Sequence, residues 1–263
     1  MGVRTERLLD AVQAPARQGA TLGVTEHRPW PLPQEQWVMG QTWEDLLFAH
    51  WLAPADAVRA LLPAGVVLDL FEGLAWIGVT PFRVTGLRAR GLPPLPVVSS
   101  FFEINTRTYV TAWAKPGIWF FSLDAASELA VLAARYGYKL PYYRAEIRAD
   151  WRGGWLSYEA RRHDRRGAPA VFRARYRPIA GQFTAVPGSL AYFLTERYCL
   201  YATDADGQLH RAEIHHPPWP LQLAEAEIEE NTMPPPGMEL VDGDPLLHFS
   251  ARQDVVIWPL RDA

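Results

Sequence analysis

The chain has 263 residues, with 26 Lys and Arg against 29 Asp and Glu and a formal net charge of −3 at pH 7. This balance lacks the basic footprint expected of a nucleic-acid-binding protein, and no stretch approaches the ~20 apolar residues of a membrane span. A composition of 49% hydrophobic and 21% charged residues is typical of a globular protein. We therefore expect a cytoplasmic protein with no nucleic-acid and no membrane partner; a homo-oligomer remains open.

The first 36 residues are expected to form a peripheral N-terminal arm. A short amphipathic stretch from Glu6 to Gln13 is followed by Gly, Pro and polar residues through Pro33, which is typical of a terminus that drapes over a body or moves freely. Residues 37–263 are expected to form a single barrel-like domain.

From Trp43 onward the pattern is mostly that of short strands joined by tight turns. Two short helices are expected, at 55–62 and 125–136, and a Pro/Gly-rich loop at 86–96 is expected to form a rim or lid. The segment 224–229 alternates Ala and Ile with Glu and is interpreted as an edge strand. The expected strands cover residues 45–51, 66–71, 74–84, 101–110, 118–123, 142–151, 155–162, 171–177, 197–202, 209–215, 224–229 and 248–258.

This arrangement predicts an α+β fold, mainly antiparallel β, built as a large closed barrel-like sheet with a few short helices. No βαβ series with a glycine-rich phosphate loop is present, so a nucleotide-binding fold is excluded.

The strand over residues 101–110 carries the clearest functional signal. Successive side chains of a strand point to opposite faces, and here one face is apolar and β-branched. The other face carries a carboxylate, an amide, a guanidinium and a phenol in line: Phe101, Glu103, Asn105, Arg107 and Tyr109.

Two interpretations of this row stay open. If the face is solvated, the row is an ordinary wet sheet surface. If it faces a barrel lumen, Glu103 is a candidate acid/base group with a raised pKa, and Arg107 is a candidate anchor for a carboxylate. Tyr142 would donate a hydrogen bond to a developing oxyanion. Further ligand contacts are expected from Asn105, His50, Trp51, Tyr109 and Arg197.

Neither a metal nor another cofactor is expected. His215 and His216 are adjacent on a strand and therefore point to opposite faces, which makes a metal site from His210, His215 and His216 geometrically poor. Cys199 is the only cysteine, and its apolar neighbours indicate a buried structural thiol rather than a nucleophile.

Several segments resemble the YqjF-like family of uncharacterised bacterial proteins. The resemblance covers roughly residues 35–260 and rests on the segments Trp43–Trp51, Ser100–Val110, Trp119–Asp124, Leu140–Tyr142, Thr195–Tyr198 and His215–Leu221. That family is in turn similar to the acetoacetate decarboxylase-like superfamily, which implies a large antiparallel barrel with a buried pocket.

The decarboxylases use a lysine Schiff base, an arginine that binds carboxylate and pocket glutamates. Position by position, the resemblance puts Glu103 in place of one pocket glutamate, Trp51 or a neighbour in place of the arginine, and Tyr142 and Tyr143 in place of the paired lysines. Acetoacetate decarboxylase activity is therefore not expected. Two hypotheses remain: an enzyme that acts on a small organic acid or ketone without an imine, and a non-catalytic binding protein for an apolar or aromatic small molecule.

Overall fold

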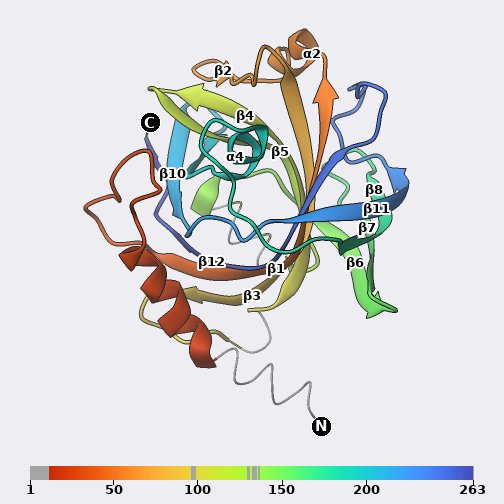
Figure 1. Ribbon diagram of the computed structural model, residues 1–263. Coiled ribbons are helices and arrows are strands. Elements are labelled where there is room, and N and C mark those ends of the chain that lie inside the picture. The colour runs from red at the N-terminus through yellow and green to blue at the C-terminus, as the bar shows by residue number, and fades with distance from the viewer. Residues whose placement is uncertain (1–11, 96–98, 129–130, 132–134, 136, 263) are drawn as a thin grey trace.

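One continuous sheet dominates the computed structural model (Figure 1), which describes residues 12–95, 99–128, 131, 135 and 137–262. Described helical segments include residues 12–20, the 3₁₀ turn η1 (Thr21–Gly23), α2 (Ala55–Arg59) and α4 (Leu190–Thr195). The described strands are β1 (Met39–Ala53), β2 (Val67–Leu68), β3 (Ala75–Ala89), β4 (Phe101–Ala112), β5 (Lys115–Ala125), β6 (Tyr142–Arg152), β7 (Trp155–Arg162), β8 (Val171–Pro178), β9 (Cys199–Thr203), β10 (Leu209–His215), β11 (Gln222–Asn231), β12 (Leu246–Ile257) and β13 (Arg261–Asp262).

The sheet closes into two circuits that share a wall. Its order is β13-β10-β9-β5-β6-β7-β8-β11-β12-β1-β3-β4-β2, and β5 pairs in addition with β4 while β10 pairs with β12. One circuit therefore runs through nine strands, including β6, β7, β8 and β11, and the other runs through β9 and β10. Strands β12, β1, β3, β4 and β5 belong to both. Strand β5 pairs in parallel with β6 and β9, whereas the other pairings of the named strands are antiparallel. The predicted closed, mainly antiparallel barrel is confirmed.

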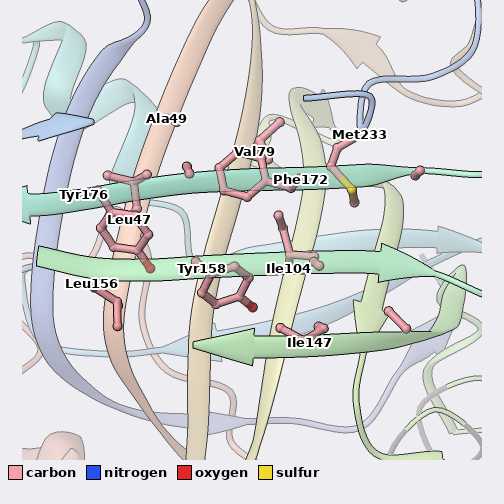
Figure 2. Packing of buried hydrophobic residues seen from close by; sticks show 14 of the residues in the cluster. Leu47, Ala49, Val79, Ile104, Ile147, Leu156, Tyr158, Phe172, Tyr176 and Met233 are labelled. Carbon is pink, nitrogen blue, oxygen red and sulfur yellow. The ribbon is translucent and has the colours of Figure 1, made fainter. Parts of the chain in front are cut away.

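The nine-strand side of the wall is filled by hydrophobic side chains (Figure 2). Ile104 of β4 is fully buried there. It packs in the same cluster as Phe172 and Tyr176 from β8 and Tyr158 from β7. The hydroxyl of Tyr158 donates to the backbone carbonyl of Glu103 at 2.8 Å, so this side also fixes the position of β4.

Helix α4 lies across one end of the seven-strand circuit (Figure 1). Ser189 caps its first turn by accepting a hydrogen bond from the backbone N–H of Tyr192. The buried Leu194 packs against Trp76 of β3 and Tyr109 of β4. This end of the circuit is therefore closed by side chains.

Bulges change which residues of β1 and β5 face inward. In β1 the register with β3 shifts between Glu44 and Ala49: five steps along β1 face the four steps from Arg83 to Val79, so β1 holds one extra residue. Asp45, within this interval, has a left-handed φ of 52°. In β5 the register with β4 shifts between Thr106 and Arg107. Each bulge reverses the alternation of the strand beyond it.

The described part of the N-terminal arm packs on the barrel. Residues 12–20 are helical, and Gln18 is fully buried. Its amide donates to the carbonyl of Gly86 at 3.0 Å and its carbonyl accepts from Arg88 at 2.7 Å. Arg28 donates to the carbonyl of Ile214 and to Glu213. Residues 12–36 thus cover the outside of β3 and β10.

Residues 224–229, expected to form an edge strand, belong to β11. Only Gln222 and Leu223 pair with β12, whereas from Ala224 onward the pairing is with β8. The strand therefore has a neighbour on both sides only at its start, and the alternating Ala/Glu segment pairs on one side among the described strands. Strand β5 continues to Ala125, into the helix expected at 125–136, and residues 129–130, 132–134 and 136 of that helix lie outside the described part. No helix in the described ranges is long and apolar enough to cross a membrane.

Candidate functional site

The seven-strand circuit encloses a cavity of about 160 Å³. Aromatic and aliphatic side chains form most of its wall, and polar groups enter mainly from β4. Its lining residues are Met39, Gln41, Trp43, Leu46, Thr80, Phe82, Leu87, Phe101, Glu103, Asn105, Arg107, Ile118, Phe120, Leu123, Tyr138, Leu140, Tyr142, Thr195, Arg197, Leu200, Ile214, His216, Trp219 and Ile257. Met39, Trp43 and Phe101 are half-buried lining residues.

The polar row of β4 lines this cavity. Glu103, Asn105 and Arg107 are all buried, with at most 7% of each residue exposed. The intervening Ile104 faces the packed core on the other side. Strand alternation therefore assigned the two faces of β4, and the polar face is not solvated. Tyr142, from the first position of β6, joins the row in the cavity.

Arg107 lies toward the closed end of the cavity with its charge uncompensated. Nε and Nη2 are buried and find no hydrogen-bond partner among the described residues. Its guanidinium carbon lies 5.2 Å from the ring centre of Phe48, a cation–π contact. Gly78 leaves room mainly for the ring of His50, since a Cβ there would lie 3.0 Å from Nε2 of His50 and 3.4 Å from Cγ of Arg107. Burial lowers the pKa of Arg107, yet an arginine keeps its proton at neutral pH.

Glu103 is a buried carboxyl group held by one tyrosine. The hydroxyl of Tyr142 donates to its Oε2 at 3.1 Å. Burial raises the pKa of Glu103 to about 8, although the bond from Tyr142 acts in the opposite direction. Burial and the neighbouring Glu103 raise the pKa of Tyr142 well above its usual value. At neutral pH both groups are therefore largely protonated and uncharged. The hydroxyl of Tyr142, expected to face a ligand oxyanion, instead donates to Glu103.

Three further residues that were expected to contact a ligand lie at the end of the cavity that α4 closes, or beneath that end. Arg197 lines the cavity, but its Nη1 donates to Asp69 at 2.7 Å and its Nε to the carbonyl of Phe193. Tyr109 donates to the carbonyl of Leu194 and therefore accepts from Nε2 of His50. His50 and Tyr109 are not part of the cavity wall. They support the closed end beneath Arg107.

Trp51 lies on the other side of the shared wall. Beyond Asp45, Leu47 and Trp51 pack in the filled core, whereas Phe48 packs toward the cavity side. Trp51 does not line the cavity, because the face of β1 that carries it points into the filled core. The ligand contact expected from Trp51 is therefore not available there.

Several lining residues were not anticipated. Thr80 stands in an apolar strand, and Trp219 and His216 flank a proline-rich turn. Thr80 Oγ1, Asn105 Oδ1 and Trp219 Nε1 are buried without a hydrogen-bond partner in the described part of the chain. A tryptophan beside prolines was the one available signal for Trp219, whereas nothing in the sequence singled out Thr80.

Except for His216, the groups considered for other chemistry lie away from the cavity. Lys115 bonds to Glu213 and Lys139 to Asp204, and neither lysine lines the cavity. Burial raises the pKa of Cys199 to about 12, so its thiol is not reactive at neutral pH. His216 lines the cavity while His215 contacts Arg28. No group of three or more His, Cys, Asp or Glu among the described residues is arranged to hold a metal ion.

Comparisons with solved structures give the fold. An enduracididine biosynthesis enzyme, MppR, complexed with pyruvate matches 90% of this chain and 92% of its own with a TM-score of 0.63 and 13% identity. An acetoacetate decarboxylase from Legionella pneumophila matches 90% of this chain and 93% of its own with a TM-score of 0.58 and 12% identity. At such low identities the likeness establishes the acetoacetate decarboxylase-like fold and nothing more.

Comparisons of sequence give the family. YqjF of Bacillus subtilis is 49% identical over 231 residues, which cover 88% of this chain and 94% of the B. subtilis protein. The model of the DUF2071 family, described as an uncharacterized conserved protein (COG2071), matches residues 40–254. These segments include the shared wall and the polar row of β4. The chain belongs to the DUF2071 family and is similar in sequence to YqjF.

Proposed function

We propose that the cavity binds a small organic acid or ketone and that Glu103 exchanges a proton with it, without a lysine Schiff base. The observation that carries this proposal is Arg107: a buried guanidinium whose Nε and Nη2 face no acceptor in the described chain. Leaving such a donor pair unbonded is costly, and a carboxylate accepts from both nitrogens in bidentate geometry.

Glu103 would act at the other end of the polar row. Its pKa of about 8 lies near neutral pH, which favours proton transfer in either direction. The ionised form takes a proton from the carbon next to a ligand carbonyl. The C–H electron pair becomes the C=C bond of an enolate, and the carbonyl electrons move to oxygen. The protonated form returns the proton by the reverse step, while Tyr142 holds the carboxyl in place.

An imine route is not part of this proposal. Tyr142 occupies the position that the resemblance assigns to a decarboxylase lysine, and Lys139 bonds to Asp204 outside the cavity. Borohydride reduction in the presence of acetoacetate should therefore leave the protein unlabelled by mass spectrometry. A reduced adduct on Lys139 would overturn this part of the proposal.

The structural relatives support a carbonyl acid as ligand. One of them is described as an MppR complex with pyruvate and another as an acetoacetate decarboxylase. Both names point to small acids with a carbonyl group. The transfer to this chain is by analogy of fold, and the residues that carry it here are Arg107 and Glu103.

A second candidate function is a non-catalytic binding protein. Most of the cavity wall is apolar and includes Phe82 from β3 and Phe120 and Leu123 from β5. A wall of this kind retains an apolar or aromatic molecule without any chemistry.

Two measurements separate these functions. A thermal-shift screen of small acids, ketones and aromatic metabolites identifies binding, because a ligand of the folded state raises the melting temperature. The same shift should vanish in Arg107→Met and persist in Arg175→Gln, whose arginine is a surface residue paired with Glu227. Proton NMR in D₂O then tests chemistry: loss of the α-proton signal of a bound keto acid, abolished by Glu103→Gln, indicates the enzyme. Binding without exchange indicates the binding protein, and acids that bind equally to Arg107→Met would contradict the proposed site.

A further inference from the structure

We propose that the ligand is an aryl monocarboxylate: one negative charge, held by Arg107, on a body of about the size of a single aromatic ring. This inference rests on the proposed acid-binding site and specifies the class of acid. An aryl monocarboxylate is larger than the short keto acids in the names of the structural relatives. The charge of the cavity, the position of Arg107 and the apolar volume together favour the larger acid.

The charge of the cavity fits one anion. Arg197 is neutralised by Asp69, and Glu103 is largely uncharged at neutral pH. Burial lowers the pKa of His216 to about 4, so this histidine is neutral as well. Within the described wall of the cavity, Arg107 thus provides a single uncompensated positive charge. A dianion would bring a second charge into an apolar enclosure without a partner, which is strongly unfavourable.

The guanidinium of Arg107, which anchors the ligand, is displaced along the shared wall from the backbone position of this residue. Arg107 stands opposite Gly78, which stands opposite His50. Its guanidinium lies beside the ring of Phe48, two residues from His50. Since alternate residues are about 6.6 Å apart along a strand, the guanidinium has moved toward the level of Asn105 and Thr80. The unpartnered Oγ1 of Thr80 is then available to donate to the same carboxylate.

The space beyond the anchor suits one ring. The cavity of about 160 Å³ compares with an apolar cavity of about 150 Å³ that binds benzene in another protein. The cavity wall carries aromatic groups that can pack on a planar ring, namely Trp43, Phe82, Phe120 and Trp219. An acetate-sized acid would satisfy Arg107 and leave most of this apolar volume unfilled.

The orientation of the ligand follows from these positions. With the carboxylate on Arg107 and Thr80, the ring extends toward Glu103. The backbones of Arg107 and Glu103 are about 13 Å apart along β4, but the guanidinium lies near the level of Asn105, which is about 6.6 Å from Glu103. A carbonyl or hydroxyl substituent on the far side of the ring, or on a short side chain, would then reach Glu103. Acids without such a substituent should bind but offer Glu103 no atom to act on.

The test is a matched ligand series measured by isothermal titration calorimetry at pH 7. Benzoate and phenylacetate should bind at least 10-fold more tightly than acetate and pyruvate, which carry the head group without the ring. Benzyl alcohol, which has the ring without the charge, and phthalate, which has a second charge, should bind at least 10-fold more weakly than benzoate.

Two variants assign the contacts. Arg107→Met should abolish benzoate binding, and the surface control Arg175→Gln should leave it unchanged. Leu123→Trp fills the apolar space while leaving the guanidinium, so it should weaken benzoate 10-fold or more but affect acetate little. This second variant also keeps the test decisive if Arg107→Met fails to fold.

The outcomes distinguish the two proposals. If pyruvate and acetate bind as tightly as benzoate and depend on Arg107, the proposed acid site stands and the aryl class is overturned. If benzoate binds equally to wild type, Arg107→Met and Leu123→Trp, it binds elsewhere, and the aryl inference fails. If no acid in the series binds, both the inference and the proposed function fail.

Discussion

The two sides of strand β4 are buried to a similar degree but have opposite properties. On one side Ile104 is fully buried in a cluster that Tyr158, Phe172 and Tyr176 fill (Figure 2). On the other side Glu103 and Arg107 border a cavity of about 160 Å³. Strand β4 thus packs in the core through even-numbered residues such as Ile104 and borders the cavity through odd-numbered residues such as Glu103 and Arg107.

The difference between the two sides explains how the fold tolerates buried ionisable side chains along β4. Groups such as Glu103 and Arg107 lower stability when buried, and the filled side supplies packing that offsets this cost. Tyr158 connects both sides, since it packs in the core and donates to the carbonyl of Glu103. The filled side therefore holds the polar row of β4 in position.

The largest effect is expected from a cavity made on the filled side. Phe172→Ala should lower the free energy of unfolding by about 3–5 kcal/mol, because a large buried side chain is removed from close packing. Phe120→Ala, on the hollow side, should cost clearly less, because its ring already borders empty space. Urea denaturation measures both. Equal losses in the free energy of unfolding would show that the two sides are packed alike, and would contradict the contrast between a filled side and a hollow side.

A pH-dependent effect is expected from Glu103. Its folded-state pKa of about 8 lies above the ordinary value of 4.5, so the folded state binds the extra proton between these values. This contribution is fully present below pH 4.5 and is lost as the pH rises to 8, by about 1.4 kcal/mol per pH unit. Glu103→Gln removes this slope, so the variant should be more stable than wild type at pH 9 and similar to it at pH 4.5. Parallel pH–stability curves for the two proteins would contradict the buried carboxyl.

A smaller gain in stability is expected at Arg107. Replacing this uncompensated buried charge with an apolar side chain in Arg107→Met should raise the free energy of unfolding by about 1–3 kcal/mol. The same variant should lose acid binding. A thermal melt with and without benzoate measures both properties. Marked destabilisation would mean that Arg107 serves the structure rather than a ligand.

The smallest effect is expected at Tyr142. Tyr142→Phe removes one hydrogen bond and should cost about 1 kcal/mol. Because the bond from Tyr142 lowers the pKa of Glu103, its loss should raise that pKa further. The midpoint of the Glu103-dependent stability loss should therefore move to higher pH. An unchanged midpoint would show that Tyr142 does not hold the carboxyl.

Sequence patterns anticipated the elements better than their connections. Alternation along residues 101–110 separated Glu103, Asn105 and Arg107 from Ile104, because strand geometry is local. The alternation at 224–229 indicated an edge, but not that the preceding residues Gln222 and Leu223 pair with β12, because pairing partners are set by distant segments. The roles of the candidate site residues remain proposals, which the experiments above address.

By itself, the sequence determined a closed, mainly antiparallel sheet, the family and the polar face of β4. Each of these follows from local periodicity or from similarity along the chain. Tertiary structure alone decided that this face borders a cavity, that Trp51 lies across the wall from it, and that Thr80 and Trp219 join it. The physical reason is twofold: bulges such as that in β1 between Glu44 and Ala49 reverse the alternation, and the cavity exists only where seven strands from distant parts of the chain close around it.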